Sequence, residues 1–402
     1  MMKRLNCNAC QGELSPPLFK VRDLPLVDSF CSTPISASQV PRFSIDICQC
    51  NTCQTIQIAS PPDTAEIYRN YIYESRSSPD LLDHFTQYAR VVSRTVPGKD
   101  RPVLEIGAND GLFLHQLIKE GFNNLVAVDP SPQTAMVSFA ETEANVEVIN
   151  QFFCYDSIKH FEKNSFVAIF ANNCFSHISD LLGVLNLCAK FLSSDGTLFV
   201  EVQSTLDLVE SVVFDYIYHE HYFYHSMISF ENLAKMAGLE VYGVEHVSTK
   251  GGSYRFSLGH KGAHVVESSV SYWKYRESIA GVHSTDTWLK LESYLAKSKL
   301  VLHEWFSNSD KPVIGFGASA TGTVFIRYMA IEHKLGAIVD DNPKRQGLYA
   351  PGTAIPIISI DELRGDERCL ILAWRHSSLI VPKLRARGIV SISPLPYLTF
   401  NG

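Results

Sequence analysis

Residues 214–226 contain the densest set of side chains that can do chemistry: Phe-Asp-Tyr-Ile-Tyr-His-Glu-His-Tyr-Phe-Tyr-His-Ser. Three histidines, one glutamate and four tyrosines are too many polar groups for thirteen residues to bury without a purpose. Histidine is the natural base near neutral pH, and tyrosine can donate to a developing oxyanion. Two other interpretations are a His-x-His metal pair, for which no third ligand is evident, and a plain helix start.

A strand, a glycine turn, a helix and a second strand precede this cluster, and the second strand ends in an acidic residue. We predict strands at 103–106 and 125–128, with a helix at 112–118 between them. This order is typical of a nucleotide-binding βαβ unit. Asp129, at the tip of the second strand, can accept hydrogen bonds from both hydroxyls of a ribose.

The turn itself favours S-adenosylmethionine over a pyrophosphate. Its pattern is Glu105-x-Gly107-x-Asn109-Asp110-Gly111 and not G-x-G-x-x-G. Phosphate prefers backbone N–H groups at a helix N-terminus, and an acidic residue there disfavours it. S-adenosylmethionine carries a sulfonium and an ammonium group, which nearby carboxylates suit. The alternative is an ordinary α/β turn without a ligand.

The βα alternation continues, which predicts a mostly parallel sheet. Further strands are expected at 145–149, 166–171 and 198–202, with a helix at 182–192 and a closing hairpin at 241–247 and 253–258. Ligands of such sheets bind beyond the carboxyl ends of the strands. The side chains expected at that edge are Asn172, Asn173, His177, Glu201 and Gln203.

Two cysteine pairs near the N-terminus predict a structural zinc site. The pairs are Cys7-x-x-Cys10 and Cys50-x-x-Cys53. Four thiolates complete a tetrahedral shell and leave no position for catalysis. The alternative is four unrelated buried thiols.

The last third of the chain contains a second glycine turn. Residues 266–310 are predicted to be helical and amphipathic. Strand, turn and helix signals follow over Val313–Gly322, and a further strand at 335–339 ends in Asp340-Asp341. Because this turn has no acidic residue inside it, it could hold phosphate. The alternative is a Rossmann-like scaffold without a dinucleotide of its own.

Length and composition bound the class of protein. The 402 residues predict two or three domains. The motifs divide this α/β chain into a zinc-binding domain (1–66), a domain with the S-adenosylmethionine turn (67–265), and a helical connector with a Rossmann-like domain (266–402). A formal charge of −7 argues against nucleic-acid binding. No apolar run reaches a membrane span, no signal-peptide core is evident, and the cysteine usage suits a cytoplasmic protein.

The three parts together resemble the sugar C-methyltransferase family of deoxysugar biosynthesis over nearly the full chain. The motifs that carry the resemblance are the four cysteines, Leu24-Pro25-Leu26-x-Asp28, Tyr71-x-Tyr73-x-Ser75, Glu105–Gly111, Asn172 with His177, Tyr218–His221, Gly251-Gly252-x-x-Arg255 and Gly315–Ala318. The chain departs from the family at Gln54, usually glycine, and at Thr321, usually lysine.

The resemblance implies methyl transfer from S-adenosylmethionine to carbon 3 of a nucleotide-linked 4-keto-6-deoxyhexose. The carbon beside a ketone is acidified, so a base can form the enolate that attacks the sulfonium methyl. We expect His221 to be the base and Glu220 and Tyr218 to hold the ketone or sugar hydroxyls, with His177 and Tyr73 closing the site. His177 is the second candidate for the base, and the nucleotide is expected toward the C-terminal domain.

Two rival classes remain. One is a nicotinamide-dependent oxidoreductase that uses the second turn, which binding of NAD(P) would favour. The other is a non-catalytic scaffold for zinc and S-adenosylmethionine, which predicts no loss of activity when His221 is changed. The expected partners are the nucleotide sugar alone, with no nucleic acid and no membrane, and the expected state is a monomer.

Overall fold

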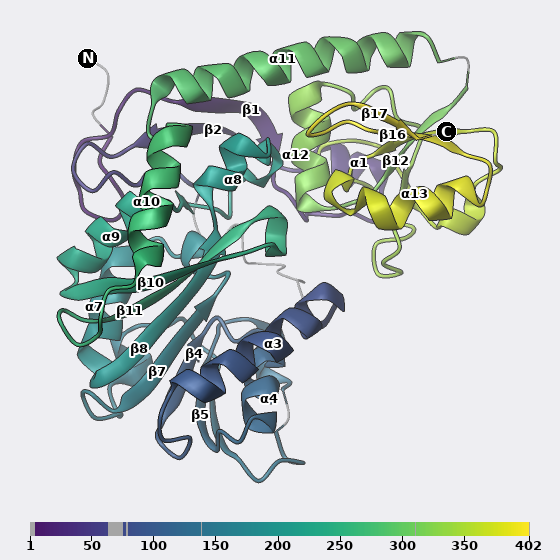
Figure 1. The fold of residues 1–402 in the computed structure, drawn as a ribbon. Coiled ribbons are helices and arrows are strands. Elements are labelled where there is room, and N and C mark those ends of the chain that lie inside the picture. The colour runs from purple at the N-terminus through teal and green to yellow at the C-terminus, as the bar shows by residue number, and fades with distance from the viewer. Residues whose placement is uncertain (1–4, 63–74, 78, 138, 310, 402) are drawn as a thin grey trace.

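The computed structural model describes residues 5–62, 75–77, 79–137, 139–309 and 311–401. Within them the chain forms three β-sheets of four, seven and six strands. Figure 1 shows the long helix α11 (Thr285–Ser307) running from the side of the four-stranded sheet to the six-stranded sheet, with the seven-stranded sheet below. The predicted α/β fold class is confirmed.

The four-stranded sheet is antiparallel and combines two distant parts of the chain. Its order is β1 (Phe19–Pro25), β2 (Arg42–Gln49), β3 (Ile56–Ile58) and β9 (Phe223–Tyr224), with α1 (Pro34–Ser38) between β1 and β2. The last strand comes from the histidine-rich stretch and pairs Gln57 with Phe223. Its place in this sheet joins the first sixty residues to a segment from the middle of the sequence. The predicted domain boundaries stay a prediction.

The seven-stranded sheet has the strand order of a methyltransferase fold. The order is β10 (Leu239–Val247), β11 (Ser253–His260), β8 (Leu192–Gln203), β7 (Phe166–Asn172), β4 (Val103–Ile106), β5 (Asn124–Val128) and β6 (Asn145–Ile149). Strands β8, β7, β4, β5 and β6 run parallel, and β10 and β11 close the edge as the predicted antiparallel hairpin.

Helices cover both faces of this sheet. They are α3 (Pro79–Thr95), α4 (Leu112–Lys119), α5 (Pro132–Ala135), α6 (Tyr155–Ile158), α7 (Leu181–Phe191), α8 (Thr205–Glu210) and α9 (Met227–Met236). On the face of α3 and α4, the Tyr88 ring stacks on Phe113 at 4.8 Å. On the other face Phe230 of α9 stacks on Phe256 of β11 at 4.2 Å. Burial of these apolar faces is the main force that holds the layers together.

The predicted connector consists of two helices and is not continuous. Gly281, in the left-handed conformation (φ 64°), ends α10 (Ser268–Ala280), and α11 begins at Thr285. Trp288, Leu291, Leu295 and Leu302 are buried along one face of α11, as their helical spacing predicts. A glycine tolerates positive φ, which explains why the chain can turn here.

The six-stranded sheet is a second Rossmann-like unit. Its order is β14 (Ile357–Ile358), β13 (Ile338–Val339), β12 (Val313–Phe316), β15 (Arg368–Ile371), β16 (Val390–Ser393) and β17 (Thr399–Asn401), with α12 (Ala320–Met329) and α13 (Ser377–Arg385). All pairs are parallel except β16 with β17. The strand predicted at 335–339 is confined to its last two residues. Along the described ranges, none of the helices has the length and apolarity needed to cross a membrane.

Candidate active site and metal centre

The first glycine turn leaves no room for a side chain at Gly107. This residue has φ 75°, and a Cβ placed on it would lie 2.7 Å from the Cβ of Cys174. The Gly107 N–H donates to the carbonyl of Val128 at 2.8 Å, which fixes the turn to the end of β5. Only glycine satisfies both conditions, because other residues avoid positive φ and would clash with Cys174.

Asp129 holds the turn from the tip of β5. Its Oδ2 accepts from the Asn109 N–H at 3.0 Å and its Oδ1 from the Ser131 N–H at 2.7 Å. The side chain is 8% exposed. Each carboxylate oxygen has a second lone pair, so Asp129 can still accept from ribose hydroxyls beyond the turn.

Glu105 and Asn172 form a buried polar pair where β4 and β7 end. The Asn172 amide donates to Glu105 Oε1 at 3.1 Å. Glu105 Oε2, Asn172 Oδ1 and Asn173 Oδ1 are buried and have no hydrogen-bond partner among the described residues. Burial raises the pKa of Glu105. Three acceptors without donors fit the ammonium and hydroxyl donors of S-adenosylmethionine, because buried acceptors are costly to leave unpaired.

Asn109 and Asp110 turn toward the short helix η1 (Ser75–Ser77). The Ser75 N–H donates to Asn109 Oδ1 at 3.1 Å, and the Arg76 N–H donates to Asp110 Oδ2 at 2.7 Å. Asp110 Oδ1 also accepts from the Leu112 N–H at the start of α4. Both side chains therefore shape the turn, and their contact with a cofactor stays a prediction. Tyr73 lies outside the described residues.

The second glycine turn copies the frame of the first but not its polar pair. Asp340 accepts from the N–H groups of Ala318 and Asn342 at 2.7 and 2.8 Å, as Asp129 does in the first unit. In the first sheet Ile106 pairs with Ala171, and in the second Phe316 pairs with Ile371, so these two pairs are equivalent positions. Gly315 precedes Phe316 as Glu105 precedes Ile106. Leu372 follows Ile371 as Asn172 follows Ala171.

His221 lies in the loop between the short helix η3 (Phe214–Tyr216) and β9. Its Nδ1 is 2.8 Å from the carbonyl oxygen of Tyr216. A carbonyl can only accept, so Nδ1 carries the proton and Nε2 of the neutral ring keeps a lone pair. Burial, followed by the nearby His177, lowers the pKa of His221 well below its ordinary value. The ring is therefore a neutral acceptor at physiological pH.

Aromatic and imidazole rings surround His221. The Tyr218 ring centroid is 4.1 Å away and the His177 centroid is 5.0 Å away in a T-shaped arrangement. Burial lowers the pKa of His177 to about 4. The structure thus brings together the predicted residues Tyr218, His221 and His177, although His177 comes from the short helix η2 (Phe175–His177) after β7.

Glu220 is a buried carboxyl next to another acid. Burial and the charge of Asp28 raise the pKa of Glu220 to about 8. Asp28 has φ 55°, an uncommon value for a residue other than glycine, and its Oδ1 is buried without a partner among the described residues. At neutral pH Glu220 is consequently protonated and can donate a hydrogen bond.

The other two histidines of the cluster face apolar rings. His219 packs edge-on against Phe43 at 5.5 Å and His225 against Phe230 at 5.5 Å. Burial lowers their pKa values to about 4 and about 3. Within the described ranges no group of three metal-binding side chains includes them. The His-x-His metal interpretation therefore gains no third ligand.

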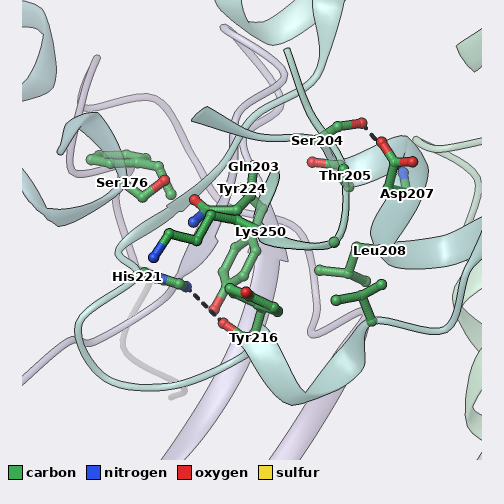
Figure 2. A pocket seen from close by; sticks show the side chains of 14 residues that line it. Ser176, Gln203, Ser204, Thr205, Asp207, Leu208, Tyr216, His221, Tyr224 and Lys250 are labelled. Atoms are coloured by element: carbon green, nitrogen blue, oxygen red, sulfur yellow. Dashed lines mark hydrogen bonds between the residues drawn. The ribbon is translucent and has the colours of Figure 1, made fainter. Parts of the chain in front are cut away.

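A small internal cavity lies beside His221, and a large cleft adjoins it. Figure 2 shows Ser176, Gln203, Tyr224 and Lys250 gathered around His221. The cavity volume is about 20 Å³, roughly enough for one water molecule. The cleft has a volume of about 1230 Å³, larger than most ligand pockets, and lies between the seven-stranded and six-stranded sheets.

The cavity and the cleft share part of their lining. The shared residues are Asp207, Tyr216, Lys250, Gly251 and Gly252. The cleft also reaches Arg375 and Ser377 after β15 and Ser393 at the end of β16. A ligand in the cleft would therefore approach His221 past the Lys250–Gly252 loop.

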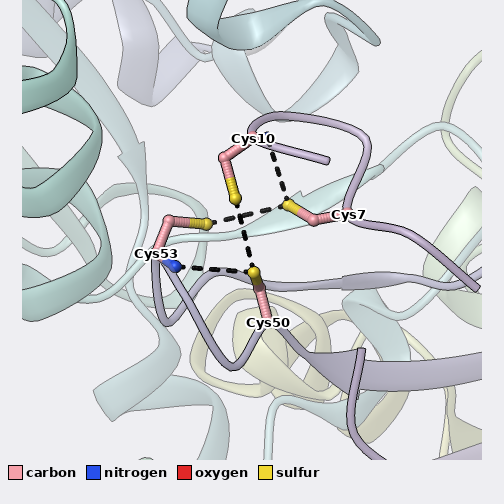
Figure 3. Close-up of side chains that lie close together, drawn as sticks. All are labelled: Cys7, Cys10, Cys50 and Cys53. Atoms are coloured by element: carbon pink, nitrogen blue, oxygen red, sulfur yellow. Dashed lines mark hydrogen bonds between the residues drawn. The ribbon is translucent and has the colours of Figure 1, made fainter. Parts of the chain in front are cut away.

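The four predicted cysteines form one cluster (Figure 3). Their sulfur atoms all lie within 4.8 Å of one another, with Cys7 to Cys53 at 3.7 Å and Cys10 to Cys50 at 3.5 Å. Backbone N–H groups of Cys10 and Cys53 point at the sulfurs of Cys7 and Cys50. Such N–H groups stabilise thiolates, so the donor set fits a tetrahedral metal ion. Gln54, where the family usually has glycine, has φ 64°.

Two residues at the site, Lys250 and Arg375, were not predicted from the sequence. Lys250 faces the cavity and its charge lowers the pKa values of both His177 and His221. Arg375 reaches the cleft from the opposite sheet. The Lys250-Gly251-Gly252 run between two strands is a turn signal, and nothing in it indicated a position beside the histidines.

Comparison with known proteins shows which families the chain is similar to. A model of the C-methyltransferase C-terminal domain matches residues 248–396, and a model of a methyltransferase domain matches residues 82–244. The C-methyltransferase NovU of Streptomyces niveus is 26% identical in an alignment 376 positions long, and the match covers 88% of each chain. Both models and this relative support the resemblance to the C-methyltransferases that the motifs gave.

Solved structures match this C-methyltransferase over a smaller part. The PH0226 protein from Pyrococcus horikoshii OT3 is 17% identical and covers 49% of this chain and 99% of its own, with a TM-score of 0.36. The Burkholderia thailandensis 1,6-didemethyltoxoflavin-N1-methyltransferase is 14% identical and covers 51% and 95%, with a TM-score of 0.34. The matches to the two models and to NovU support an S-adenosylmethionine-dependent C-methyltransferase.

Proposed function

We propose that this C-methyltransferase transfers the methyl group of S-adenosylmethionine to carbon 3 of a nucleotide-linked 4-keto-6-deoxyhexose. The tautomer of His221 carries the proposal, because the Tyr216 carbonyl accepts a hydrogen bond from Nδ1–H and leaves the lone pair of Nε2 to accept a proton in a buried site. The motifs that resemble the sugar C-methyltransferases support the choice of substrate. The nucleotide would lie in the cleft, toward the six-stranded sheet.

The proposed reaction has two steps. His221 Nε2 removes the proton from carbon 3, and the electron pair of that C–H bond forms the enolate, with its charge on the oxygen at carbon 4. Carbon 3 then attacks the methyl group, and the electron pair of the methyl–sulfur bond stays on sulfur, which gives S-adenosylhomocysteine. The enolate charge favours the adjacent imidazolium, so His221 becomes a stronger base as the charge develops.

Neutral donors would stabilise the enolate. Glu220 is protonated below about pH 8 and can donate to the oxygen at carbon 4. Tyr218, whose ring lies 4.1 Å from His221, supplies a phenol. His177 would close the site, and Tyr73 is proposed for the same role on the basis of the resemblance alone. The Lys250 ammonium adds a positive charge near the developing oxyanion.

The cofactor would bind at the first glycine turn. Gly107, Gly111 and Asn109 shape the backbone, Asp129 would hold the ribose, and Glu105, Asn172 and Asn173 offer their unpaired acceptors to the amino-acid part. Asp110 would contribute negative charge near the sulfonium. The four cysteines are proposed to hold one structural zinc ion.

The ribose contact can be tested against a matched carboxylate. Asp129→Ala should weaken S-adenosylmethionine binding about 10- to 100-fold, since charge-assisted hydrogen bonds contribute about 1.5–3 kcal/mol each. Asp340→Ala removes the equivalent carboxylate from the second unit and should leave the affinity unchanged. Calorimetry measures both, and equal loss in the two variants would place the cofactor elsewhere.

The zinc proposal predicts about one zinc ion per chain in elemental analysis, as one four-thiolate site requires. Cys50→Ser should lower stability, since structural zinc sites contribute directly to folding. Strand β3 follows the second cysteine pair and its Ile58 N–H donates to the Tyr222 carbonyl. Faster hydrogen exchange of that amide should accompany metal loss, and a stable, active, metal-free protein would refute the site.

The base can be identified by proton exchange without methyl transfer. With a 4-keto nucleotide sugar and S-adenosylhomocysteine in deuterium oxide, the wild type should incorporate deuterium at carbon 3. His221→Asn should lose this exchange by about 10²–10⁴-fold, the usual contribution of a general base, and keep its cofactor affinity. His177→Asn is the control. Loss of exchange in the His177 variant alone would make His177 the base. Undiminished methylation by His221→Asn would show that His221 is not the base, and a wild type without any methylation would support the non-catalytic scaffold.

The pH profile tests Glu220. Its raised pKa means that the donor form is present below about pH 8 and is lost above it, so the rate should fall on the alkaline side. The same shift removes stability as the pH rises from the unfolded value near 4.5 through 8, because the folded state holds the proton more tightly. Glu220→Gln keeps a donor and should flatten the alkaline limb. A limb that persists in this variant belongs to another group.

A further inference from the structure

A buried ion pair connects the six-stranded sheet to the loop of His221. Arg375 Nη1 lies 2.7 Å from Asp215 Oδ1 and 2.9 Å from Oδ2, and the Trp374 indole N–H donates to Oδ2 at 3.0 Å. Asp215 is fully buried in η3. Arg375 and Trp374 belong to the short helix η6 (Trp374–His376), which follows β15. The pair therefore joins two short helices, η3 and η6, that are far apart in the sequence.

The contact continues from Arg375 to the imidazole. The guanidinium carbon lies 4.7 Å from the centroid of the Tyr216 ring, a cation–π distance. The Tyr216 ring is parallel to the His221 ring within 7°, at 5.9 Å, and the Tyr216 carbonyl accepts from His221 Nδ1. Arg375 thus contacts the side chain of Tyr216. The carbonyl of Tyr216 selects the tautomer of His221, and its ring stacks on the imidazole.

Other contacts already attach η3 to the six-stranded sheet. Phe214 packs on Phe325 and Tyr328 of α12 at 6.1 and 4.8 Å. Burying an ion pair costs desolvation energy, and apolar groups of similar size often stabilise a fold equally well. The planar guanidinium makes two contacts that an apolar group cannot make. It forms a directed hydrogen bond to Asp215, and its flat face packs on the Tyr216 ring.

We propose that Arg375 is a positioning residue for proton abstraction, which acts on His221 through Asp215 and Tyr216. Arg375 also lines the cleft. The short helix η6 would therefore both meet the nucleotide part of the substrate and hold the proposed base in place. The inference rests on the proposed function of His221.

The decisive variant is Asp215→Asn combined with Arg375→Met, which removes both charges and leaves no lone buried ion. We expect cofactor affinity to be unchanged and deuterium exchange at carbon 3 to fall about 10- to 100-fold, the order expected when a catalytic group moves by about 1 Å. In protein labelled with ¹⁵N-histidine, the His221 signals should shift from the Nδ1–H form toward a mixture of tautomers. Comparison with His221→Asn assigns those signals.

Arg375→Lys is the second variant, because it keeps a positive charge beside Asp215 but loses the planar face over Tyr216. It should give an intermediate shift. Arg101→Met, which breaks the exposed ion pair with Asp195, is the matched control and should change neither readout. Wild-type His221 signals and exchange rates in both Arg375 variants would overturn the proposal. Retained exchange in His221→Asn would overturn the proposed base, while the ¹⁵N signals would still decide whether Arg375 positions the ring.

Discussion

The pairing of β3 with β9 is the constraint on which the proposed site depends. Two residues after His221 the chain becomes a strand of the four-stranded sheet, with Phe223 opposite Gln57. The same Gln57 donates its side-chain amide to the Cys7 sulfur at 2.9 Å. One short strand therefore links the cysteine cluster to the loop of the proposed base. If the cluster holds zinc as proposed, a metal site far from His221 in sequence sets the position of that side chain.

Burial also sets the protonation states of the side chains in and around this loop. Removing water lowers the pKa values of His177 and His221 and raises that of Glu220, so the imidazoles are neutral and the carboxyl keeps its proton near pH 7. Both forms are the ones that the proposed enolisation requires. The cost is a set of buried polar groups with few partners in the described residues, and such groups persist where the rest of the fold holds them.

The sequence predicted those elements whose signal is local. The spacing of the cysteines, the turn at Gly107 and Gly111, and the alternation of strands and helices each lie within a few residues, and each appears in the structure. Contacts between distant segments could not be predicted in this way. Asp215 and Arg375 are separated by 160 residues, and neither has a neighbour that marks it as half of a buried pair. The sheet membership of β9 escaped prediction for the same reason, because a two-residue strand has no periodicity of its own.

The two glycine turns share one backbone arrangement but differ in the side chains beside it. In both units an aspartate at the tip of the second strand accepts a hydrogen bond from one N–H group of the glycine turn, so that carboxylate alone does not distinguish a cofactor site. The difference lies two residues before the first glycine of the turn. A Cβ on Gly315 would lie 2.6 Å from the side chain of Leu372, so leucine fills the space that Glu105 and Asn172 occupy in the first unit. An apolar side chain cannot receive an ammonium group, whereas a carboxylate with an unpaired oxygen can. The chemistry of these two positions therefore favours the first turn for S-adenosylmethionine. The second turn lacks the polar pair, and the cleft beside its sheet is the proposed place for the nucleotide part of the substrate.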